Sequence, residues 1–200
     1  MFAEMYDEFI AEHKRRNIAL GFVFEDNPKV ASANKRIKIE NKLTCHHVMP
    51  KCIGGMNSSS NYVYLKQDDH DFAHMLLGLS FIEMHKPLNE INSVGMTGLF
   101  NPTCVKKLFD EFPDIKTAIR FTICTFDGVQ LSMTPNEAAT MMCFKVGISP
   151  LNPANTNKSL AKLFAAVYGS SSENGLGTTF GHKVAIEWKK NKKFIRMNKR

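Results

Sequence analysis

The stretch CHHVMPKCIGGMNSSSNYVYLKQDDHDFAHML, from Cys45 to Leu76, holds four of the chain's seven histidines. It pairs two histidines, passes a Gly-Gly dipeptide and an Asn, and then places His70 and His74 four residues apart. Histidines at this spacing on a helix project from the same side, so one metal ion could bind both. This stretch is therefore the first place to expect a metal site.

Local signals predict a strand, a turn, a second strand and a helix across this stretch. Ile37 and Ile39 alternate with polar residues before the histidine pair, so an extended segment is expected there. The segment KCIGGMNSSSN has turn composition, and NYVYL has the composition of a short strand. Asp68 is the expected N-cap of the helix that follows. The apolar residues of that helix share one stripe: Phe72, Met75, Leu76 and Leu79.

The histidine pair lies at the end of the first predicted strand, where successive side chains point to opposite faces. Only one of His46 and His47 can therefore point at the helix histidines. If that one is His46, then His46, His70 and His74 give three nitrogen ligands and leave coordination positions open, as a catalytic metal requires. His47 would then be free to act as a general base.

Asn61 begins the second predicted strand, across the hairpin from the histidine pair. A carboxamide can bond to backbone in both directions, so Asn61 is expected to hold the loop that carries His47. Gly54 and Gly55 allow this loop to turn tightly beside the site.

Taken together, these residues resemble the HNH, or His-Me finger, nucleases with their ββα-metal motif, and most closely the phage-type pattern. The matching segments are HHVMP at 46–50, Gly-Gly at 54–55, NYVYL at 61–65, and His-x-x-x-His at 70–74. The resemblance covers about residues 37–80. The Tyr-containing amphipathic helix predicted over about residues 2–16 matches the N-terminal helix of that family.

The resemblance implies a DNA endonuclease that uses one divalent metal ion to hydrolyse phosphodiester bonds. It assigns His46, His70 and His74 as metal ligands, His47 as the general base and Asn61 as its orienting residue. Mg²⁺ or Mn²⁺ is the expected ion for activity; three imidazole ligands would also admit Zn²⁺ or Ni²⁺. Lys51, just after Pro50, is a candidate for a phosphate contact.

The net charge of +7 resides in the C-terminal tail WKKNKKFIRMNKR, residues 188–200. The 19 basic residues before it equal the 19 acidic residues of the chain. Such a tail would release counterions on binding double-stranded DNA; the alternative is a solvated end that only aids solubility. The expected phosphate contacts in the tail are Lys189, Lys190, Lys192, Lys193 and Arg196.

The expected fold class is α+β. Residues 1–91 are predicted to form the nuclease domain, and residues 92–200 a mainly helical region that places the DNA. The segment 115–126 has helix-like or mixed periodicity. Further along, Thr134, Pro135 and Glu137 have the pattern of a capped helix start. Residues 155–169 have the pattern of another amphipathic helix, and KVAIEW that of a short strand or helix.

The cysteine usage and the apolar segments indicate in which compartment this protein is expected. Five cysteines without a CxxC pair fit a reducing compartment, and no window has the length of a membrane span. We therefore expect a cytoplasmic protein with no membrane partner, in a host cell if the gene belongs to a bacteriophage.

The same residues allow other functions. A homing endonuclease is the leading role by resemblance, but a restriction or defence nuclease would use the same site. A third alternative is a non-catalytic DNA-binding module with a structural zinc site that includes Cys45 or Cys52. The oligomeric state, the DNA target and the number of strands cut stay open.

Overall fold

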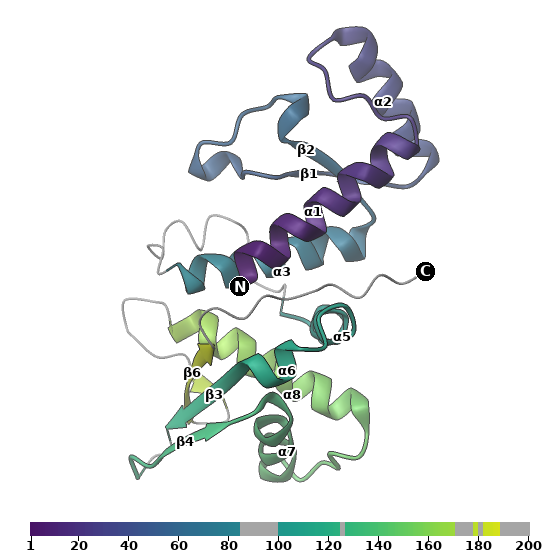
Figure 1. Cartoon of the computed structure of the whole chain (residues 1–200). Helices are drawn as coiled ribbons and strands as arrows, with labels where there is room; N and C mark the ends of the chain where they lie inside the picture. Colours follow the sequence, from purple (N-terminus) through teal and green to yellow (C-terminus); the bar gives the residue numbers. More distant parts are fainter. Residues whose placement is uncertain (85–99, 125–126, 171–177, 180–181, 189–200) are drawn as a thin grey trace.

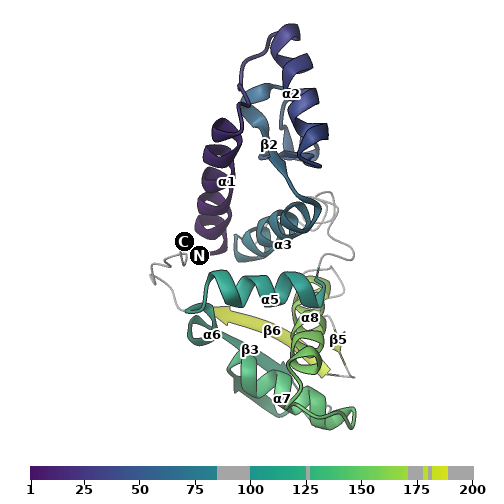
Figure 2. The ribbon, with the colours of Figure 1, turned by 90° about the vertical axis from the view of Figure 1, so that its right-hand side faces the viewer.

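The structure, a computed structural model, describes residues 1–84, 100–124, 127–170, 178–179 and 182–188. Helices are combined with two antiparallel sheets, so the α+β class is confirmed. Figures 1 and 2 show the N-terminal elements at one end of the molecule and the later helices and larger sheet at the other. The predicted division at residues 91 and 92 lies outside the described residues.

The expected hairpin and helix are present. Strand β1 (Thr44–His47) pairs with β2 (Tyr62–Leu65) in an antiparallel register that sets His46 opposite Val63. Two short 3₁₀ turns, η1 (Lys51–Ile53) and η2 (Ser59–Asn61), lie between the strands. Helix α3 (Gln67–Glu83) follows directly.

The N-cap of α3 differs from the prediction. Lys66, not Asp68, occupies the N-cap position, and it makes no side-chain capping bond. Asp68 and Asp69 lie inside the first turn, where their negative charges favour the positive end of the helix dipole.

The helix predicted over about residues 2–16 is present as α1 (Phe2–Ala19), and it covers α3 and β2. The apolar face of α1 is buried against these elements: Phe2, Met5, Tyr6, Phe9 and Ile10. Contact between Phe9 and Phe72, with ring centroids 5.2 Å apart, joins α1 to the helix that carries two of the site histidines. Packing of α1 against α3 therefore helps to position the histidines of that helix.

The prediction of an extended segment around Ile37 and Ile39 is wrong, because helix α2 (Pro28–Glu40) occupies this part of the chain. Asn27 caps the helix by accepting a bond from the Lys29 N–H, and Pro28 supplies the backbone angle of the first turn. Two alternating residues are too short a pattern to outweigh this helix start.

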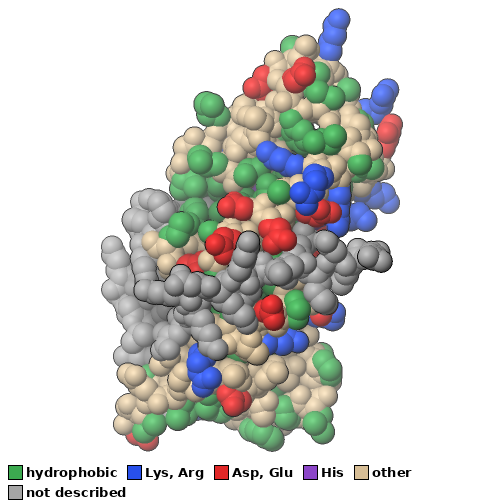
Figure 3. All heavy atoms as spheres, in the orientation of Figure 1, with side chains coloured by type: hydrophobic (Ala, Val, Ile, Leu, Met, Phe, Trp, Pro, Cys, Tyr) green, Lys and Arg blue, Asp and Glu red, His purple; other side chains and the backbone are tan. Residues whose placement is uncertain are grey.

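Figure 3 shows Lys and Arg side chains gathered over the end of the molecule that holds α2.

The second half is less helical than predicted. Strand β3 (Ile119–Cys124) lies within the segment expected to be helix-like or mixed, and it pairs with β4 (Gln130–Met133) and β6 (His182–Trp188). With β5 (Thr178–Thr179) they form one sheet in the order β4-β3-β6-β5. Alternating burial along β3 gives the reason, since every second residue from Ile119 onward is buried.

The expected helices of this half are present. Helix α7 (Pro135–Lys145) starts with a complete capping box between Thr134 and Glu137, and α8 (Pro153–Ser170) packs against α7 and β6. Helix α5 (Pro102–Glu111) contacts both α3 and α8, and the short α6 (Ile115–Ala118) leads into β3. The apolar core continues through both halves of the described chain.

Candidate metal centre

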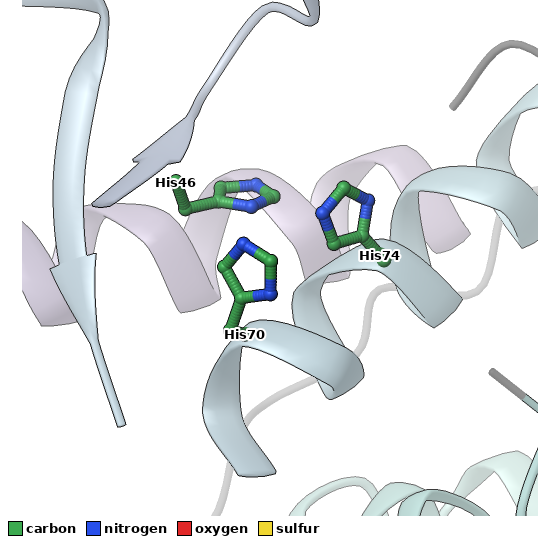
Figure 4. A group of neighbouring side chains, drawn as sticks. All are labelled: His46, His70 and His74. Carbon is green, nitrogen blue, oxygen red and sulfur yellow. The ribbon is translucent and has the colours of Figure 1, made fainter. Parts of the chain in front are cut away.

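Three histidines from two elements meet beside the hairpin. His46 comes from β1, and His70 and His74 come from successive turns of α3. One nitrogen of each lies within 4.8 Å of the others, and Figure 4 shows the three rings grouped together. The ring centroid of His46 lies 5.1 Å from that of His70 and 4.7 Å from that of His74. These residues could hold a metal ion.

The surroundings keep two of these imidazoles neutral. Burial, together with the neighbouring His74, His70 and His47, lowers the pKa of His46 to about 2. Burial also lowers the pKa of His70, while Asp71 acts in the opposite direction. A neutral imidazole offers the lone pair that a metal ion needs, so both pKa shifts favour metal binding.

His46 also has an atom that fits a ligand. Its side chain is 1% exposed, and its Nδ1 is buried and makes no hydrogen bond within the part of the chain that the structure describes. Its Nε2 lies 3.0 Å from the Tyr6 hydroxyl. A buried polar atom without a partner is costly, and a bound cation would satisfy it.

His47 lies on the other side of β1, as strand alternation requires. Its Nε2 is 3.0 Å from the Asn57 Oδ1, and its ring meets the edge of Tyr62 with centroids 5.0 Å apart. An amide oxygen only accepts hydrogen bonds, so the ring donates from Nε2 and keeps its lone pair on Nδ1. The partly exposed His47 therefore has an atom that can accept a proton.

Asn61 holds the backbone just after His47. Its Oδ1 accepts from the Met49 N–H at 2.7 Å, and its Nδ2 donates to the carbonyl oxygens of Met49 and Met56, each at 2.9 Å. The Val48 N–H also donates to the Asn61 carbonyl at 2.9 Å. Asn61 thus fixes the loop, whereas the bond to the His47 ring comes from Asn57.

The Gly-Gly dipeptide is required by this loop for two different reasons. Gly54 has a φ of 96°, in the left-handed region that glycine tolerates best. At Gly55 a β-carbon would lie 1.8 Å from the Met49 carbonyl oxygen, which is the oxygen that Asn61 contacts. The backbone can approach this closely only with glycine at 55.

A pocket of about 260 Å³ opens beside these groups. Although strand alternation separates His46 from His47, the pocket brings His47 together with His70, His74 and Lys51. Cys45, Pro50 and Cys52 complete its lining. Neither cysteine belongs to the group of close ligand atoms among the described residues.

The structure does not describe the predicted phosphate contacts of the tail. Lys189, Lys190, Lys192, Lys193 and Arg196 lie outside the described residues. Lys51 is the one predicted phosphate contact that the described chain places, and it is exposed on the pocket.

Two residues at the site were not predicted from the sequence. Tyr6 is on the buried face of α1, where a hydroxyl needs a hydrogen-bond partner, so its position was a signal that some polar group lies opposite. Asn57 lies in a turn rich in Asn and Ser, and nothing in its local sequence distinguished it from its neighbours.

Among the described helices, none combines the length and apolar character that a membrane crossing demands.

Comparisons with protein-family models, with curated proteins and with solved structures found no match to this chain.

Proposed function

We propose that this protein is a metal-dependent endonuclease that hydrolyses phosphodiester bonds of double-stranded DNA through a ββα-metal site of the HNH type. One observation carries the proposal: His47, His70, His74 and Lys51 line the same pocket. His46 is the third member of the histidine group formed with His70 and His74. The proposed general base His47, two of the proposed metal ligands and the positively charged Lys51 thus share one pocket that a phosphate group could enter.

Each residue of the pocket has a chemical task in this reaction. His47 takes a proton at Nδ1 from a water molecule as the water oxygen attacks phosphorus. The bond to Asn57 holds the opposite ring nitrogen protonated, and Asn61 keeps the loop in place. Lys51 contacts a non-bridging phosphate oxygen. As the bond from phosphorus to the 3′ oxygen breaks, solvent protonates the leaving oxygen.

A divalent ion held by His46, His70 and His74 would supply positive charge where negative charge develops on the phosphate and the leaving oxygen. Imidazole ligands suit Zn²⁺, Ni²⁺ and Mn²⁺, whereas Mg²⁺ prefers oxygen. We propose Mg²⁺ or Mn²⁺ for activity, with the softer ions binding more tightly. Tight binding does not require the fastest catalysis.

A structural zinc module is the alternative of another class. Such sites usually close all four coordination positions, often with thiolates. Here the close ligand atoms are three histidine nitrogens, and a further histidine that is not among them lines the same pocket. This arrangement favours catalysis. The biological role as a phage homing endonuclease, rather than a restriction or defence nuclease, rests on the sequence resemblance alone.

Conversion of supercoiled plasmid tests the proposal, with Mg²⁺, Mn²⁺ or EDTA and with DNA of the encoding genome included. We expect metal-dependent cutting that disappears in His47→Ala and persists in Glu8→Gln, a control at an exposed residue of α1. Discrete bands would favour a homing role over general degradation. If wild-type protein binds Zn²⁺ but cuts no DNA with any ion, the structural module becomes the better description.

A further inference from the structure

Tyr6 contacts the metal centre from outside the hairpin and helix that carry the histidines. It lies on α1, it is 4% exposed, and its hydroxyl reaches β1 and the residue after it. The hydroxyl donates to the Val48 carbonyl at 2.8 Å and lies 3.0 Å from the His46 Nε2. Tyr6 therefore touches the residues on both sides of His47.

These two contacts determine where the proton of His46 sits. A tyrosine hydroxyl has one hydrogen, and a backbone carbonyl can only accept. Because the Tyr6 hydrogen goes to Val48, the hydroxyl can only accept from His46. Its partner must therefore be an Nε2–H group. In the opposite tautomer the two acceptors, Val48 and His46 Nε2, would compete for the single hydrogen.

The remaining nitrogen of His46 is then the one that can bind a cation. A neutral imidazole that carries its proton on Nε2 has its lone pair on Nδ1. This Nδ1 is buried and makes no hydrogen bond with the residues described by the structure. The His46 ring packs edge-on against both helix histidines, as Figure 4 shows.

We propose that Tyr6 is a positioning residue of the metal centre: its hydroxyl holds His46 in the Nε2–H tautomer, so that the metal ion binds His46 through Nδ1. The inference rests on the metal site of the proposed function, but it does not depend on DNA cleavage. It makes α1 part of the site, since the same hydroxyl ties a metal ligand to the loop of the general base.

Zinc affinity of metal-free protein tests this inference, measured by competition with a chelator. Partners that orient metal-binding histidines typically contribute 10- to 100-fold in affinity. We expect Tyr6→Phe to bind Zn²⁺ more weakly, with a Kd raised by about that factor. Tyr62→Phe is the matched control, because the Tyr62 hydroxyl contacts Asn57 at 3.3 Å and no histidine of the metal group. Circular dichroism of each variant verifies the fold.

A second measurement needs no variant. In zinc-loaded wild-type protein, long-range ¹H–¹⁵N correlation spectra of the histidine rings should show His46 protonated at Nε2 and metal-bound at Nδ1. Metal binding at Nε2 would overturn the proposal, as would equal Zn²⁺ affinity of Tyr6→Phe and Tyr62→Phe. Failure of the proposed nuclease function would appear separately, as intact Zn²⁺ binding without plasmid cutting.

Discussion

His47 and Asn57 are joined by a 3.0 Å contact between the ring Nε2 and the side-chain Oδ1. His47 is the last residue of β1, and Asn57 lies ten residues later, within the connection to β2. The contact fixes the proton of His47 on Nε2 and leaves Nδ1 as the acceptor. Orientation of a base by a third group is the arrangement by which general bases and nucleophiles are commonly activated.

Asn57→Ala should slow DNA cleavage while the metal stays bound. The His47 ring would no longer have the bond that fixes its tautomer, and we expect the single-turnover rate to fall about 10-fold, a fraction of the 10²–10⁴ that a general base contributes. Ser59→Ala is the control in the same loop, because Ser59 is held through its backbone N–H, which donates to Asp26 at 2.6 Å. An unchanged rate in Asn57→Ala would remove Asn57 from the site.

Asn61→Ala should damage the loop and the activity together. The variant lacks three hydrogen bonds to the backbone of Met49 and Met56, each contributing about 0.5–1.5 kcal/mol. We expect the free energy of unfolding in urea to fall by about 1.5–4.5 kcal/mol, and cleavage to fall by more than in Asn57→Ala. Zn²⁺ affinity should stay within a few-fold of wild type, since the three histidines come from β1 and α3. A large decrease in Zn²⁺ affinity would contradict this division of roles.

The two adjacent glycines should respond differently to alanine. Gly55→Ala places a β-carbon against the Met49 carbonyl, so the loop must move, and we expect stability to fall by at least about 1–3 kcal/mol and cleavage to cease. Gly54→Ala meets nothing within 4 Å and incurs only the strain of a left-handed residue, about 1–2 kcal/mol. Urea unfolding of both variants compares them; a more harmful Gly54→Ala would refute the close-approach argument.

Metal-free protein should lose stability as the pH falls below about 6.5. The folded state holds the pKa of His46 near 2, below its ordinary value of 6.5, so the unfolded chain binds more protons in between. Stability is therefore full above pH 6.5 and decreases on acidification, by up to about 1.4 kcal/mol per pH unit for this group. Urea unfolding in EDTA from pH 7.5 to 5 measures the slope.

His46→Gln supplies the comparison for that pH series, because it removes the buried titrating group. The slope between pH 6.5 and 5 should become shallower in this variant. Equal slopes in wild type and His46→Gln would show that other groups dominate the acid response.

The basic tail should govern the salt dependence of DNA affinity. Replacing Lys189, Lys190, Lys192, Lys193 and Arg196 with Gln should reduce the slope of log Kd against log salt by up to about 0.9 for each phosphate that the tail no longer neutralises. Binding to a labelled duplex over a salt series gives this slope. If the slope does not change, the tail is a solvated end, and Lys51 is left as the phosphate-binding residue to test.

The sequence by itself determined those features that depend on neighbours in the chain. The spacing of His70 and His74, the alternation of His46 and His47, the turn at the glycines and the capping box at Thr134 are all local, because helix and strand periodicity and capping bonds act over a few residues. The hairpin, α1, α3, α7 and the histidine group were predictable for this reason.

Only the tertiary structure decided which distant segments meet. The alternation of Ile119, Phe121 and Ile123 is a local feature of β3, but that β3 pairs with β6, much further along the chain, is decided only by the tertiary structure. The Tyr6 hydroxyl reaches His46 across 40 residues only because α1 packs on α3 and β2. The same packing buries the His46 ring, and this burial, not the motif spacing, lowers the pKa of His46 and favours its neutral form.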